Sequence, residues 1–72
     1  MNAQEFKIGV ETAIKERLTG KITEKTEKAI QFMMDRFDEE KVNNMLANKF
    51  QGREYDFFFH FGKQVVMVEE KF

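Results

Sequence analysis

The stretch from Tyr55 to Phe61 constrains the fold of this chain more than any other, because aromatic residues alternate along it. Its odd positions hold only aromatic residues: Tyr55, Phe57, Phe59 and Phe61. Successive side chains of a strand point to opposite faces, so this alternation predicts a strand with one wholly aromatic face. Phe58 makes the opposite face partly apolar, and such a strand needs cover on both sides.

The pattern with period two continues beyond this stretch, after a short turn. We expect strands over residues 54–61 and 64–70, joined by Gly62 and Lys63, because a two-residue loop with Gly first suits a type II′ hairpin turn. The inner face of this hairpin would hold Tyr55, Phe57, Phe59, Phe61, Val66 and Val68. This face is predicted to form the floor of the core.

Before Gly52, apolar residues recur at helical spacing, which predicts three helices, over residues 3–19, 24–36 and 39–50. Each follows a residue that favours the N-cap position: Asn2, Thr23 and Asp38. Gly20 and Gly52 follow the first and third helices and suit their C-terminal stops. Residues 24–50 could instead form one bent helix, but Phe37 and Val42 occupy hydrophobic-staple positions and favour a break. Gly9 could permit the close approach of another backbone, but it is interpreted as a glycine tolerated within the first helix.

The predicted fold class is therefore α+β, in which three helices pack on a C-terminal antiparallel hairpin in the order α-α-α-β-β. The 72 residues form one predicted domain over 1–72. So small a domain buries only about 60% of the surface of its unfolded chain. The chain has no Cys and thus no disulfide, which leaves close packing or self-association as the source of stability.

The outer face of the hairpin is the predicted interaction surface: Phe58, His60, Val65 and Met67. Both strands of a lone hairpin are edges, and three helices do not easily cover both of its faces. A second copy of the chain could extend or cover the hairpin and make a homodimer. Alternatively, another protein could bind by strand addition or patch docking, or a helix and Phe72 could cover the face in a monomer.

The residues that carry common enzyme chemistry are scarce in this chain. It has no Cys and no Ser, and His60 is the single His. Asp56 is four residues from His60, which is beyond contact on an extended strand. The sequence contains no phosphate-binding glycine motif and no H-E-x-x-H zinc motif. We therefore predict a protein that is not an enzyme, with no catalytic residues, no cofactor and no metal site.

Charge patterning gives one alternative function, the binding of single-stranded nucleic acid by aromatic residues on the hairpin. The basic residues that could contact phosphates are Arg17, Lys21, Lys25, Lys28, Arg53 and Lys63. However, 12 basic residues are balanced by 13 acidic ones, and no segment is strongly basic. Glu54, Asp56, Glu69 and Glu70 surround the proposed platform and repel phosphate.

The remaining patterns predict a cytoplasmic protein. No apolar run approaches the roughly 18 residues of a membrane span, and the N-terminus lacks the apolar region of a secretory signal. The chain is predicted to be a small interaction protein, a homodimeric regulator or inhibitor that binds another protein through its hairpin. Small domains without Cys or motifs are typical of accessory or phage-type regulators.

Overall fold

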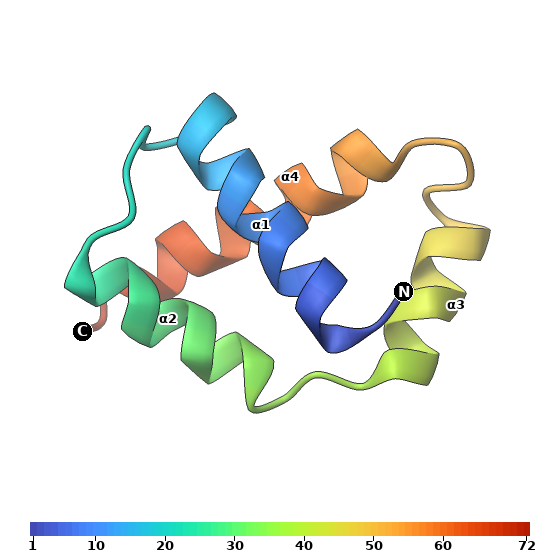
Figure 1. Cartoon of the computed structure of the whole chain (residues 1–72), viewed down its shortest axis with the longest axis horizontal. Helices are drawn as coiled ribbons and strands as arrows, with labels where there is room; N and C mark the ends of the chain where they lie inside the picture. Colours follow the sequence, from blue (N-terminus) through green and yellow to red (C-terminus); the bar gives the residue numbers. More distant parts are fainter.

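A computed structural model describes all 72 residues and shows four α-helices and no strand (Figure 1). The helices are α1 (Ala3–Arg17), α2 (Glu24–Met34), α3 (Glu39–Asn48) and α4 (Glu54–Glu69). Because α4 takes the place of both predicted strands, the prediction of an α+β fold with a C-terminal hairpin is wrong. The fold is all-α.

The aromatic segment forms a helix because its apolar residues also fall on one helical stripe. Phe57, Phe61 and Val65 are spaced four residues apart, and all three pack in the core or against it. A helix buries one stripe and leaves the opposite side in water, whereas the hairpin needed cover on both faces. Glu54 and Asp56 lie in the first turn of α4, where negative charge complements the helix dipole. Tertiary packing thus overrides the strand preference of the aromatic and β-branched residues.

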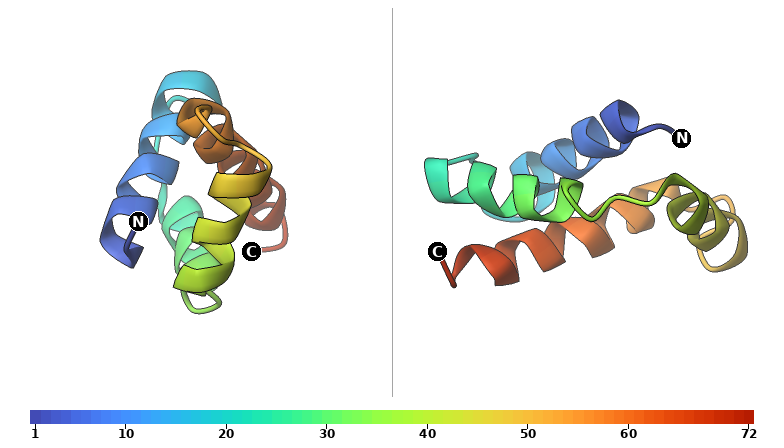
Figure 2. Two further views of the ribbon diagram at one scale, coloured as in Figure 1. Left: turned by 90° about the vertical axis from the view of Figure 1, so that its right-hand side faces the viewer. Right: turned by 90° about the horizontal axis from the view of Figure 1, so that it is seen from below.

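α4 packs against both α1, which crosses it, and α2 (Figures 1 and 2). α3 stands apart, near the N-terminal end of α4 (Figure 1). It is attached through the buried side chain of Val42 and the half-buried side chains of Met45 and Leu46. Asn43 also connects α3 to the N-terminus. Its carboxamide accepts a hydrogen bond from the Met1 ammonium at 2.9 Å and donates one to the Met1 carbonyl at 3.2 Å.

The core draws on all four helices. Its buried apolar members are Phe6, Val10, Ile14, Ala29, Ile30, Val42, Phe57 and Val65. Phe6 links the helices, since its ring centroid lies 5.9 Å from that of Phe57, 5.0 Å from that of Phe61 and 5.2 Å from that of Phe37. The contacts with Phe57 and Phe61 are edge-to-face, which suits the charge distribution of aromatic rings. The prediction that the odd positions of the aromatic segment form the floor of the core is only partly right. Phe57 is buried and Phe61 packs against the core, but Tyr55 is 58% exposed and Phe59 is not part of the core cluster.

The local signals for the first three helices are confirmed. Asn2, Thr23 and Asp38 are the N-caps, and each side chain accepts a hydrogen bond from a backbone N–H of the first turn. Gly20 and Gly52 have φ values of +79° and +72°, the left-handed conformation that favours glycine. The three helices begin at the predicted residues, each ends two residues earlier than predicted, and α2 and α3 are separate.

Gly62 forms no turn and instead marks the point where α4 meets α1. A Cβ atom at this position would lie 3.0 Å from Leu18 Cδ1 and 3.4 Å from Ile14 Cγ1. The missing side chain therefore lets the two helices approach closely. Gly62, which was predicted in a hairpin turn, thus allows two helices to cross closely.

Gly9 has a similar role on α1, and replacing it with alanine is expected to destabilise the protein. A Cβ atom here would lie 2.4 Å from two atoms of the Phe58 ring, so the ring must shift. Over-packing of this kind costs about 1–3 kcal/mol and outweighs the gain of about 1 kcal/mol that alanine brings to a helix interior. Urea unfolding should show a net loss of up to about 2 kcal/mol for Gly9→Ala.

A double-mutant cycle provides the control for this prediction. In a Phe58→Ala background the ring is gone, and Gly9→Ala should then stabilise the protein. Stabilisation in both backgrounds would show that Gly9 is simply a tolerated glycine.

A small polar network ties the beginning of α2 to the end of α4. Thr26 is buried, and its hydroxyl donates to Glu69 Oε1 at 2.5 Å, while the Thr23 hydroxyl donates to the same oxygen at 3.1 Å. The carboxylate thus satisfies the buried hydroxyl, which would otherwise carry a desolvation cost. These hydrogen bonds connect α2 to α4.

Candidate functional site

The predicted interaction surface is divided between different sides of α4. Val65 is a core residue with 1% exposure, and Phe58, which is half-buried, packs its ring on Gly9. His60 is half-buried, with ring centroids 5.7 Å from Phe50 and 5.1 Å from Phe61. Met67 is 68% exposed. These residues would share one face only on a strand, so the helix does not bring them together.

The six basic residues predicted for nucleic-acid contact are also mostly separated. Lys28 lies 4.0 Å from Glu24 and Arg53 lies 3.9 Å from Asp56, as exposed ion pairs. Lys21 and Lys25 are exposed on the connection to α2 and on its first turn. The structure places Arg17 and Lys63 at the same aromatic ring.

Arg17 and Lys63 meet at the ring of Phe59. The Arg17 guanidinium carbon lies 4.1 Å from the ring centroid of Tyr55 and 4.4 Å from that of Phe59. Lys63 Nζ lies 5.2 Å from the Phe59 centroid. Tyr55 and Phe59 are four residues apart and therefore neighbours on a helix. The cations of the protein itself already occupy positions over these rings, where a base would have to stack.

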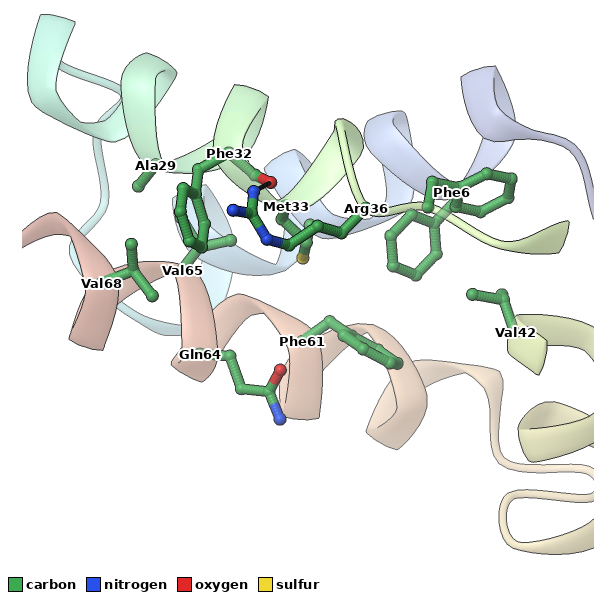
Figure 3. A pocket seen from close by; sticks show the side chains of 11 residues that line it. Phe6, Ala29, Phe32, Met33, Arg36, Val42, Phe61, Gln64, Val65 and Val68 are labelled. Atoms are coloured by element: carbon green, nitrogen blue, oxygen red, sulfur yellow. Dashed lines mark hydrogen bonds between the residues drawn. The ribbon is translucent and has the colours of Figure 1, made fainter.

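A groove with a mostly apolar lining lies between α2 and α4 (Figure 3). We call it the α2–α4 groove. It has a volume of about 260 Å³, and α1, α3 and the connection before α3 also contribute to it. Its lining consists of Phe6, Ala29, Phe32, Met33, Arg36, Phe37, Val42, Phe61, Gln64, Val65 and Val68. Nine of these eleven residues are hydrophobic, and none is acidic.

Helical spacing positions the walls of the groove. On one side, Ala29, Phe32, Met33 and Arg36 follow one another at intervals of three, one and three residues, and on the other side Phe61, Gln64, Val65 and Val68 have the same intervals. Residues with these spacings line one face of a helix. Figure 3 shows the row of α2 across from Val65 and Val68 of α4, whereas the side chain of Gln64 points away from α2. The groove therefore extends along both helices.

Arg36 lies just beyond the end of α2 and holds a defined position in the groove (Figure 3). Its guanidinium carbon lies 3.6 Å from the ring centroid of Phe32, and Nη1 donates a 2.8 Å hydrogen bond to the Phe32 carbonyl. This contact satisfies a backbone carbonyl at the helix end. Arg36 is in neither of the two ion pairs of the structure.

Neither Phe32 nor Arg36 was predicted as a site residue. The available signal was Phe32 itself, a large apolar residue that lies off the main apolar stripe of its helix, with Arg36 four residues later. In the structure Phe32 is 40% exposed and lines the groove. A bulky apolar residue outside the buried stripe is thus the sequence sign of this surface.

No protein-family model, curated protein or solved structure matches this chain. None of its helices combines the length and the apolar character needed to cross a bilayer. No group of three or more His, Asp or Glu side chains is placed to hold a metal ion. The α2–α4 groove is the candidate functional site.

Proposed function

We propose that the protein is a cytoplasmic, non-enzymatic interaction module that binds an amphipathic helix of another protein in the α2–α4 groove. The observation that carries this proposal is the groove lining, which is apolar in nine of eleven residues and includes the exposed ring of Phe32. Burial of apolar surface drives most protein association, at about 25 cal/mol per Å². A partner that covers an open apolar groove on a small domain stabilises that domain.

A helix suits the shape of this groove. Both walls carry residues at helical spacing, so a third helix can lie between α2 and α4 with its ridges packed into the grooves between their side chains. Such a partner would present apolar residues at i, i+3, i+4 and i+7 along one face. The length of the groove along α2 and α4, rather than a single deep cavity, supports a helix over a compact ligand.

An enzymatic function has little support from this site. The groove contains two polar side chains, Arg36 and Gln64, and no acid, His or nucleophile. General acid–base or nucleophilic chemistry needs several such groups converging on one point. Binding of single-stranded nucleic acid stays a weaker alternative, supported only by the juxtaposition of Arg17 and Lys63 with the rings of Tyr55 and Phe59.

A displayed library of helical peptides tests the proposal. Each peptide has about 16 residues, enough to span about 24 Å at 1.5 Å per residue, with a fixed apolar row and randomised flanking positions. Peptides selected on the wild-type protein should bind Phe32→Gln about tenfold more weakly, because truncating a central anchor of an interface costs more than about 1 kcal/mol. Fluorescence anisotropy with labelled peptides measures this change.

Tyr55→Gln is the matched control, because it removes an exposed aromatic ring from another side of α4. Its affinity for the selected peptides should stay within about twofold of wild type, in line with the near-neutral effect of residues outside a hot spot. Failure to select any peptide, or equal losses in the two variants, would contradict the proposal. Sedimentation of the same variants at rising concentration tests the predicted homodimer, and a dimer abolished by Phe32→Gln alone would make a second copy the occupant of the groove.

A further inference from the structure

We infer that Arg36 makes the α2–α4 groove selective for helices that carry an Asp or Glu beside their apolar row. This inference rests on the proposed docking function and adds to it the chemistry that the partner must have. It assigns to Arg36 the role of a specificity-determining residue.

The first observation is that the guanidinium of Arg36 is held in place before any partner binds. The Phe32 ring supports its face at 3.6 Å, and the Phe32 carbonyl accepts a hydrogen bond from Nη1. That bond is the only one that Arg36 makes with its side chain. The remaining N–H donors of its planar fork match the geometry of a carboxylate. A preorganised cation loses less conformational freedom when it binds an anion.

The second observation is that this cation has no carboxylate of its own. No acidic residue lines the groove. The acids nearest in sequence have other partners, since Asp35 accepts a hydrogen bond from the Gln31 amide and Asp38 accepts one from the backbone N–H of Lys41. Toward the end of α4, Glu70 and Lys71 border a neighbouring hollow and have opposite charges. The net charge offered by the groove lining is therefore that of Arg36 alone.

An ion pair between Arg36 and a carboxylate of the partner helix would form in apolar surroundings. A helix seated in the groove would displace water from the apolar side chains around Arg36, which lowers the local dielectric and strengthens an ion pair. A carboxylate would form charge-assisted hydrogen bonds with the fork. A Lys of the partner helix at the same position would face Arg36 with a like charge in a site from which water is partly excluded. The groove therefore favours acidic helices and rejects basic ones.

Three versions of one selected peptide test the inference. They share the apolar row and carry Glu, Gln or Lys at the flanking position where the selection most enriches acids. The wild-type protein should bind the Glu peptide about tenfold more tightly than the Lys peptide, the difference expected for one such pair. Added salt should reduce this preference.

Two variants of Arg36 assign the preference to this residue. Arg36→Met keeps an unbranched apolar stem against the Phe32 ring and should bind the three peptides equally. Arg36→Glu should reverse the order and prefer the Lys peptide. Far-UV circular dichroism of both variants should match wild type, because the side chain is exposed.

The possible outcomes distinguish a failure of the Arg36 selectivity from a failure of the docking function. Tight binding of all three peptides by the wild type, or selected sequences without acid enrichment, would overturn the role of Arg36 and leave the docking groove in place. A preference for Glu that persists in Arg36→Met would overturn it too. If no helical peptide binds at all, the docking function fails and the selectivity fails with it.

Discussion

Phe57→Ala is expected to remove a large share of the free energy of unfolding of the protein. The Phe57 side chain has 0% exposure, and its ring contacts those of Phe6, Phe50, Phe58 and Phe61. Removing a buried Phe costs about 3–5 kcal/mol, since the transfer energy and the contacts around the cavity are both lost. A domain of this size has a total stability of about 4–11 kcal/mol. Differential scanning calorimetry should therefore show a Tm lower by at least about 12 °C.

Tyr55→Ala is the informative comparison for this prediction. On the predicted strand, Tyr55 and Phe57 shared one buried face and would cost similar amounts. On α4, Tyr55 is 58% exposed and stacks on Arg17, so its loss should cost less than about 1 kcal/mol. Equal losses of Tm in the two variants would contradict the helical assignment of this segment.

Lys63→Pro is the second substitution for which we expect a large effect. Lys63 is exposed, so the change removes little packing. In the middle of α4, however, proline eliminates a backbone hydrogen bond, and its ring clashes with the carbonyl four residues earlier. The cost is about 3 kcal/mol or more. Far-UV circular dichroism should show a large loss of helical signal, and urea denaturation a strongly reduced midpoint.

Lys63→Ala serves as the control for the side chain of Lys63. It should stay within about 0.5 kcal/mol of wild type, as is usual for exposed positions. In a two-residue turn made by Gly62 and Lys63, the N–H of residue 63 lies outside the strand ladder, and proline there would cost far less. A Lys63→Pro variant with the spectrum and Tm of wild type would therefore contradict α4.

The parts of the fold that were predictable from sequence depend on interactions over a few residues. Asn2 caps α1 through a hydrogen bond that spans three residues, and Asp38 caps α3 in the same way. Gly20 and Gly52 end helices because their own φ angles are positive. Such signals act within one turn of chain. They can be recognised without knowledge of the packing around them.

The candidate site was much less predictable. Phe32 and Arg36 line the groove only because α4, about thirty residues later in the chain, runs alongside α2. A hairpin in place of α4 would remove Phe61, Val65 and Val68 from the opposite wall. The prediction that Phe58, His60, Val65 and Met67 share a surface failed for the same reason, since it assumed side chains that alternate with period two.

The amino-acid sequence alone is sufficient for three capped helices and for the break between α2 and α3. Only the tertiary structure decides that residues 54–69 form a helix. Their apolar residues satisfy period two and a helical stripe at once, so local preference leaves both conformations open. The faces of α1 and α2 cover one stripe of α4, with Gly9 and Gly62 making room at the crossing. They could not cover both faces of a hairpin, and this difference in buried apolar surface selects the helix.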